Sequence, residues 1–65
     1  MLGNTYILSG YIYSISDGRP VAYILDKYIY TINNSEIYFI SNDYIYNTHD
    51  TSEQYWISGQ YIYKV

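Results

Sequence analysis

The sequence contains no cysteine and only one histidine among its 65 residues. The absence of thiols excludes a disulfide framework and any thiolate metal site. A single imidazole also excludes a multi-histidine metal site within one chain. We therefore expect no bound metal and no cofactor, and a chain this short must find its stability in packing or in association with other chains.

Basic residues are almost as scarce. Only Arg19, Lys27 and Lys64 carry positive charge, they lie far apart in the sequence, and the net charge is −3. Nucleic acids and anionic membrane surfaces are bound mainly by clustered lysine and arginine, so neither is expected as a partner. The chain shows no signal peptide and no long apolar run, which makes a cytoplasmic location the default expectation.

Tyrosine is abundant, with 12 of the 65 residues. The tripeptide Tyr-Ile-Tyr occurs four times, at spacings of 17, 16 and 17 residues. β-branched and aromatic residues dominate, whereas alanine, leucine and methionine are few, and this bias favours strands over helices. The copies are Tyr11-Ile12-Tyr13, Tyr28-Ile29-Tyr30, Tyr44-Ile45-Tyr46 and Tyr61-Ile62-Tyr63.

A second apolar triplet precedes each Tyr-Ile-Tyr, after a link of two or three turn-forming residues. Such a unit is typical of a β-hairpin. We predict a single all-β domain over residues 1–65, with four hairpin repeats at about 6–22, 23–37, 38–54 and 55–65 and eight short antiparallel strands. The preceding triplets are Tyr6-Ile7-Leu8, Tyr23-Ile24-Leu25, Tyr38-Phe39-Ile40 and Tyr55-Trp56-Ile57; the links are Ser9-Gly10, Asp26-Lys27, Ser41-Asn42-Asp43 and Ser58-Gly59-Gln60.

The ends of the chain favour closure of these hairpins into a ring. The last strand runs to Val65 and the first begins near Thr5, so the one linker that is missing would join the fourth repeat to the first. Closure also has a physical motive, because an open edge made of Tyr-Ile-Tyr would invite edge-to-edge aggregation. We predict a closed, flower-like or barrel-like arrangement around a pseudo-fourfold axis.

The alternation of side chains along a strand predicts two different faces. One carries a central apolar set, and the other carries all twelve tyrosines. The central set is too small to offset the conformational entropy of the chain, so most tyrosines should be covered by neighbouring hairpins or by a second subunit. A homo-oligomer is therefore expected. The central set is Ile7, Ile12, Ile24, Ile29, Phe39, Ile45, Trp56 and Ile62.

The segment from Ile12 to Ile24, Ile-Tyr-Ser-Ile-Ser-Asp-Gly-Arg-Pro-Val-Ala-Tyr-Ile, resembles the small four-fold β-flower proteins of bacteria. The later repeats keep the Ile-Tyr pair and the tyrosine-containing triplet of each hairpin. They replace Gly-Arg-Pro-Val-Ala with Asn-Asn-Ser-Glu-Ile and Thr-Ser-Glu-Gln. The resemblance implies four hairpins around a pseudo-fourfold axis. It implies no established activity and no functional residues.

Catalytic groups are not indicated. His49 and Asp50 are the only neighbouring histidine–carboxylate pair, with Ser52 close by, and a solvated turn explains them better than a catalytic arrangement. The carboxylates all fall in predicted turns or linkers, without the close alternation of a calcium loop. We expect a protein that is not an enzyme, with no catalytic and no metal-binding residues.

The repeated tyrosines are the one feature of the sequence that suggests a binding function. Our leading hypothesis is a structural or protein-interaction module that associates with itself through its tyrosine-rich surface. The alternative is a small-molecule or glycan-binding module, in which aromatic rings stack on sugars or surround a quaternary ammonium group. The equivalent ring positions for such binding are Tyr13, Tyr30, Tyr46 and Tyr63.

Overall fold

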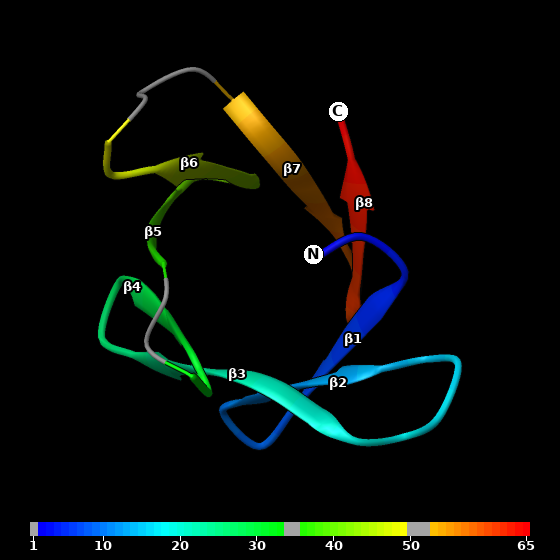
Figure 1. Cartoon of the computed structure of the whole chain (residues 1–65). Coiled ribbons are helices and arrows are strands. Elements are labelled where there is room, and N and C mark those ends of the chain that lie inside the picture. Colours follow the sequence, from blue (N-terminus) through cyan, green and yellow to red (C-terminus); the bar gives the residue numbers. More distant parts are fainter. Residues whose placement is uncertain (1, 34–35, 50–52) are drawn as a thin grey trace.

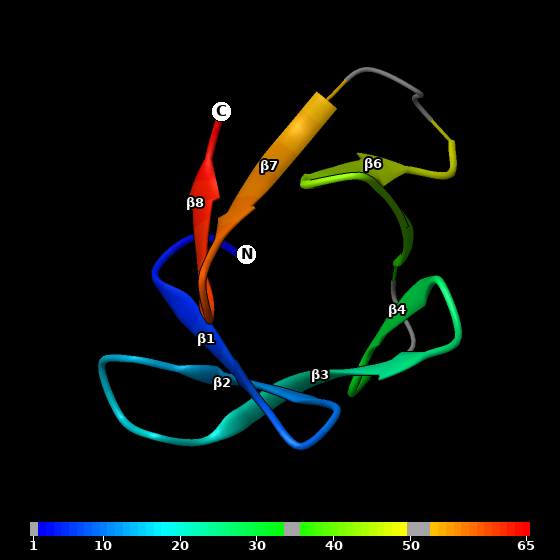
Figure 2. The same ribbon diagram turned by 180° about the vertical axis from the view of Figure 1, so that it is seen from behind.

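A computed structural model describes residues 2–33, 36–49 and 53–65 of the chain. The described residues form eight antiparallel strands and no helix, and consecutive strands pair around a closed barrel (Figures 1 and 2). The predicted all-β fold of eight short strands in a closed arrangement is confirmed. The strands are β1 (Thr5–Leu8), β2 (Tyr11–Ser14), β3 (Pro20–Leu25), β4 (Tyr28–Thr31), β5 (Ile37–Ser41), β6 (Tyr44–Asn47), β7 (Glu53–Ser58) and β8 (Tyr61–Lys64).

The barrel closes where the first strand meets the last. β1 pairs with β8, with Thr5 opposite Ile62 and Tyr6 opposite Tyr61. The amide of Ile7 also donates to the carbonyl of Gln60 over 2.7 Å. Each of the eight described strands thus has two neighbours, which removes the exposed edges that would template aggregation.

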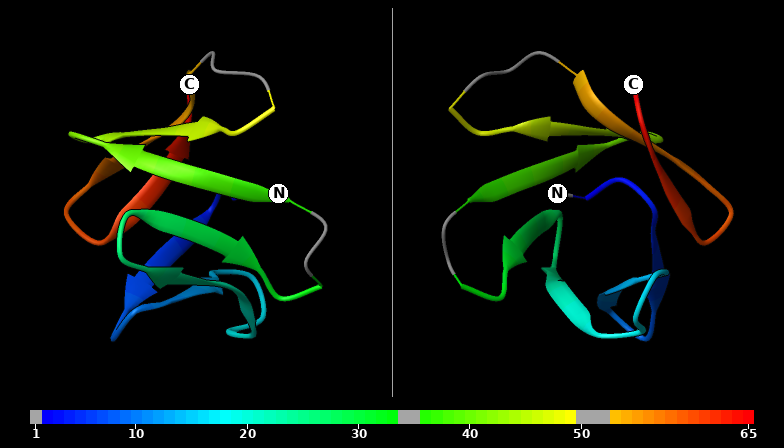
Figure 3. Two further views of the ribbon diagram at one scale, coloured as in Figure 1. Left: turned by 90° about the vertical axis from the view of Figure 1, so that its left-hand side faces the viewer. Right: turned by 45° about the vertical axis from the view of Figure 1, so that its right-hand side comes forward.

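The contact between one hairpin and the next repeats around the wall, where each hairpin lies beside its neighbour (Figure 3). The bond from Ile7 to Gln60 has three counterparts of 2.7–2.8 Å: Ile24 N to Gly10 O, Ile40 N to Lys27 O and Ile57 N to Asp43 O. Each joins the first strand of a hairpin to the turn of the preceding one. The pseudo-fourfold axis itself stays a prediction.

All four hairpin turns contain two residues. Ser41 lies opposite Tyr44 and Ser58 lies opposite Tyr61, so both serines belong to strands. The predicted three-residue links are therefore wrong for the third and fourth repeats. Two-residue hairpin loops need a positive φ at their first residue, which here is Ser9 (53°), Asp26 (60°), Asn42 (57°) or Gly59 (63°). Of these, only Gly59 adopts that conformation without crowding of a Cβ atom.

This shorter turn moves two triplets by one residue and reverses their faces, because side chains alternate along a strand. Phe39 and Trp56 take the outward positions that Tyr6 and Tyr23 occupy in the first two hairpins. Tyr38 and Tyr55 point inward and are 3% and 7% exposed. The predictions that Phe39 and Trp56 are central core residues and that all twelve tyrosines share one face are thus wrong.

The core contains one isoleucine from each Tyr-Ile-Tyr, and all four are at most 1% exposed. Around them the first strands contribute unequal groups, small in β1 and β3 (Thr5 and Ala22) and large in β5 and β7 (Tyr38 and Tyr55). The isoleucines are Ile12, Ile29, Ile45 and Ile62.

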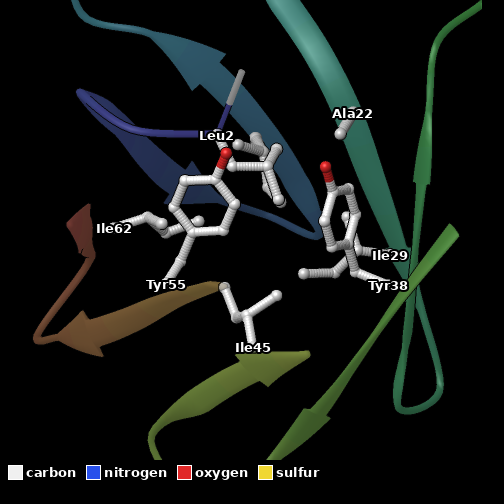
Figure 4. Packing of buried hydrophobic residues seen from close by; sticks show 8 residues of the cluster. Leu2, Ala22, Ile29, Tyr38, Ile45, Tyr55 and Ile62 are labelled. Carbon is white, nitrogen blue, oxygen red and sulfur yellow. The ribbon is translucent and has the colours of Figure 1, made fainter. Parts of the chain in front are cut away.

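The N-terminal segment completes the core. Leu2 precedes β1, yet its side chain is fully buried in the barrel, near the inward-pointing rings of Tyr38 and Tyr55 (Figure 4). Those two rings meet edge to face, with centroids 6.0 Å apart. The hydroxyl of Thr5 donates to the carbonyl of Leu2 over 2.5 Å, which fixes the segment to the first strand. Leu2 thus belongs to the same apolar cluster as the strand residues.

Candidate functional site: the outer aromatic belt

The outer wall of the barrel carries twelve aromatic side chains, at least one from every described strand. We call this set the aromatic belt. None of its members is buried, because each alternates with an inward-facing neighbour on its strand. The belt consists of Tyr6, Tyr11, Tyr13, Tyr23, Tyr28, Tyr30, Phe39, Tyr44, Tyr46, Trp56, Tyr61 and Tyr63.

Each hairpin holds one stacked aromatic pair across its two strands. The ring centroids are 5.4 Å apart for Tyr6–Tyr13 and Tyr23–Tyr30, 5.1 Å for Phe39–Tyr46 and 4.8 Å for Trp56–Tyr63. The two residues of each pair lie opposite each other in the strand register. Cross-strand aromatic pairs of this kind contribute about 0.5–1.5 kcal/mol beyond the area they bury.

The four ring positions predicted from the sequence have the same structural role. Tyr13, Tyr30, Tyr46 and Tyr63 each supply the second-strand ring of a stacked pair. They come from β2, β4, β6 and β8, so they are spread around the barrel and are not gathered into one site. Any ligand of these rings would meet one stacked pair at a time.

The belt continues across the seams between hairpins. Tyr11 lies opposite Tyr23, Tyr28 opposite Phe39, Tyr44 opposite Trp56 and Tyr61 opposite Tyr6. The rings at the hairpin tips remain open to solvent, with exposed fractions of 41–49% for Tyr11, Tyr28, Tyr44 and Tyr61. The expectation that neighbouring hairpins cover the tyrosines is therefore wrong for these rings. Cover by a second subunit stays a prediction.

Sequence reasoning missed Phe39 and Trp56 as members of these pairs. A partial signal lay in the turns, because Asn42-Asp43 and Gly59-Gln60 can form two-residue loops without Ser41 and Ser58. Counting back from those loops places Phe39 and Trp56 at the positions of Tyr6 and Tyr23. An alignment of the repeats on tyrosine therefore differs by one residue from an alignment on the turns.

The polar candidates do not form a second site among the described residues. His49 is exposed, and its amide donates to the side-chain oxygen of Asn47 over 2.8 Å, as in a local turn. Asp50 and Ser52 lie outside the described residues. Asp17 accepts a bond from the amide of Arg19 over 3.1 Å in another turn. Across the described ranges, no three His, Asp or Glu side chains approach closely enough to hold a metal ion.

A small polar cluster lies beside the core. The hydroxyl of Tyr38 donates to the carboxylate of Glu36 over 2.7 Å, and the amide of Glu36 donates to the hydroxyl oxygen of Thr31 over 3.2 Å. Burial raises the pKa of the Tyr38 phenol well above its ordinary value, and the hydrogen bond and negative charge of Glu36 raise it further. The folded state therefore holds this phenol in its neutral form.

This pKa shift predicts a stability that falls in alkaline solution. Below about pH 10, the ordinary pKa of tyrosine, the phenol is protonated in both states. At higher pH the Tyr38 phenol ionises only in the unfolded state. Its contribution to the free energy of unfolding should therefore fall by about 1.4 kcal/mol per pH unit. Chemical denaturation over this range, with Tyr38→Phe as the control, measures the effect. The difference between wild type and variant should shrink as the pH rises; a constant difference would contradict the assignment.

The described residues contain no helix that is long and apolar enough to cross a membrane. Comparisons with protein-family models, with curated proteins and with solved structures give no significant match to this chain.

Proposed function

We propose that the protein is a non-enzymatic interaction module that binds through its aromatic belt, with a second copy of the same chain as its first partner. The observation that carries the proposal is the belt itself, which leaves twelve aromatic rings on the outside of a chain with a total accessible surface of 4395 Å². Soluble monomers rarely leave contiguous apolar patches of more than a few hundred Å² open to water.

The composition of the belt supports a binding role. Tyrosine and tryptophan combine a large apolar surface with a polar tip and few rotatable bonds, and they are enriched at protein interfaces. The stacking of four pairs, at 4.8–5.4 Å between centroids, also holds these rings in place before any partner arrives. Rings that are ordered in advance lose less conformational entropy on binding.

Sedimentation velocity over about a hundredfold range of protein concentration tests self-association, because mass action shifts a reversible oligomer with dilution. We expect the average mass to rise with concentration above that of one 7.7 kDa chain. A mass that equals one chain throughout that range would contradict self-association as the role.

Glycan binding is the second candidate, and the fourth hairpin favours it. Trp56 and Tyr63 form the tightest stack at 4.8 Å and remain 39% and 44% exposed. Their flat faces suit the C–H face of a sugar ring, in the way that aromatic side chains elsewhere stack on bases. Trp56 is the only tryptophan, so its fluorescence reports on this hairpin alone. Titration with a panel of oligosaccharides should change that fluorescence; a flat response throughout would remove this candidate.

The resemblance to four-fold β-flower proteins agrees with the eight-stranded closed barrel. We propose membership of that family on the motif from Ile12 to Ile24 and on the hydrogen bonds that recur between hairpins. A pseudo-fourfold axis through the barrel is part of this proposal.

A further inference from the structure

The four hairpins differ in the aliphatic residues that flank the aromatic belt. At the hairpin tip, the residue opposite the first tyrosine of Tyr-Ile-Tyr is Leu8 in the first hairpin and Leu25 in the second. The same position is Ser41 in the third and Ser58 in the fourth. Leu8 and Leu25 are 49% and 62% exposed, so the exchange of leucine for serine changes the solvent-accessible surface of the hairpin tips.

At the opposite end of the strands the difference is smaller, because the third hairpin has Thr48 there whereas the fourth has Val65, which is 63% exposed. The equivalent residues are Ile15, Ile32, Thr48 and Val65, because their amides make the same bond of 3.0–3.2 Å to a carbonyl within or next to the neighbouring strand. Ile15 and Ile32, from the first two hairpins, are 52% and 51% exposed. The first two hairpins therefore carry an aliphatic row at both ends of the belt. We call their outer surface the apolar face: Leu8, Tyr11, Ile15, Leu25, Tyr28 and Ile32, with the stacked pairs Tyr6–Tyr13 and Tyr23–Tyr30 between them.

Charge is divided in the same way. Residues 1–33 contain two acidic and two basic residues, Asp17, Asp26, Arg19 and Lys27, so this half of the chain is neutral. Residues 34–65 contain four acidic residues and one basic residue, which accounts for the whole net charge of −3. Two copies that meet through their first halves would bring no net charge together. Contact through the second halves would oppose like charges.

The exposed area of the apolar face approaches that of one standard interface. The two tyrosines, of about 150–250 Å² each, and the four smaller aliphatic side chains are about half exposed and together offer roughly 400 Å², to which the four stacked tyrosines add. A stable protein–protein interface buries about 800 Å² on each partner. A single hairpin offers far less area than this, whereas the two adjacent hairpins together approach it.

We infer that the apolar face is the interface of a homodimer, formed by two copies related by a twofold axis. In such an interface the same surface patch of both copies meets. Apolar residues must therefore face apolar residues, and acidic residues must face basic ones. The charges at the two ends of β3 meet this condition. Asp17 and Arg19 precede the strand, and Asp26 and Lys27 follow it. When two β3 strands run in opposite directions across the axis, the start of each strand faces the end of the other, and acid can face base at both ends.

This inference rests on the proposed self-association and names the surface that carries it. The test uses sedimentation velocity and light scattering to compare two double variants, one inside and one outside the apolar face, that each replace exposed aliphatic residues with serine. Leu8→Ser/Leu25→Ser gives the first two hairpins the serines that the third and fourth already carry at these positions. The control, Ile37→Ser/Val65→Ser, removes exposed aliphatic area from the third and fourth hairpins, outside both the apolar face and the aromatic belt.

We expect wild type to reach the mass of two chains and to remain there at higher concentration. Each leucine counts twice in a symmetric dimer, so Leu8→Ser/Leu25→Ser should raise the dissociation constant at least about a hundredfold. The control should change it less than about tenfold. Circular dichroism of both variants, unchanged from wild type, establishes that they remain folded.

The outcomes separate the two proposals. A wild type that stays monomeric at every concentration overturns self-association and the dimer together. A wild type that associates, with the control variant losing the dimer and the leucine variant keeping it, overturns the apolar face while self-association stands. Continued growth beyond two chains would overturn the twofold interface, because a closed dimer leaves no matching surface free.

Discussion

Deletion of residues 61–65 should abolish cooperative folding of the whole chain. These residues contain β8, which pairs with β7 on one side and with β1 on the other. Without β8, both neighbours become unpaired edges rich in aromatic residues, and the core loses Ile62, which is 1% exposed. Opening a small closed barrel therefore removes packing and protection from aggregation at the same time.

Thermal unfolding followed by circular dichroism, together with light scattering, measures this result. The truncated chain should show no sigmoidal transition and should aggregate at concentrations where wild type stays clear. Deletion of Val65 alone is the matched control, because this residue is 63% exposed and follows β8. The control should unfold within a few degrees of wild type. A truncated chain that unfolds cooperatively would show that closure is not required for folding.

Leu2→Ala should lower the free energy of unfolding by about 2–5 kcal/mol, the range found for buried leucine to alanine changes. The Leu2 side chain is fully buried, and the surrounding strands cannot collapse easily onto the space it leaves, because the barrel wall is closed. For a domain of this size, a loss of about 2 kcal/mol lowers the melting temperature by roughly 10 °C.

Leu8→Ala supplies the comparison for this prediction, since it removes the same atoms from a side chain that is 49% exposed. Both variants are measured by urea denaturation at one low protein concentration, so that association does not contribute. We expect the midpoint to fall far more for Leu2→Ala than for Leu8→Ala. Equal shifts would mean that the segment before β1 does not fill the barrel.

The hairpins and the closure of the ring could be predicted from local chemistry. Strands were recognisable from the repeated Tyr-Ile-Tyr, and turns from pairs such as Ser9-Gly10, because these signals depend on neighbouring residues. Closure followed from the cost of leaving aromatic edges unpaired. The equivalence of Tyr13 and Tyr63, at the two ends of the series, also followed from the repeat.

The positions of Phe39, Trp56, Tyr38 and Tyr55 were decided by register. The repeats are imperfect copies, and in the third and fourth units a tyrosine stands one residue before the position that Tyr6 and Tyr23 occupy in the first two. A shift of one residue exchanges inside for outside along a whole strand, and nothing in the tyrosine pattern alone excludes that shift. Only the pairing of Ser41 with Tyr44 and of Ser58 with Tyr61 fixes it.

The sequence by itself thus determined which segments become strands, because strand and turn signals are short-range, and it favoured closure, because aromatic edges are costly to leave unpaired. The tertiary structure alone decided which aromatic rings enter the core and that Leu2 fills the space beside them. Thr5 and Ala22 are small where Tyr38 and Tyr55 are large, so the interior is filled unevenly from its four sides. Whether such groups complement one another depends on distances across the barrel, which exist only once all eight described strands have closed around the core.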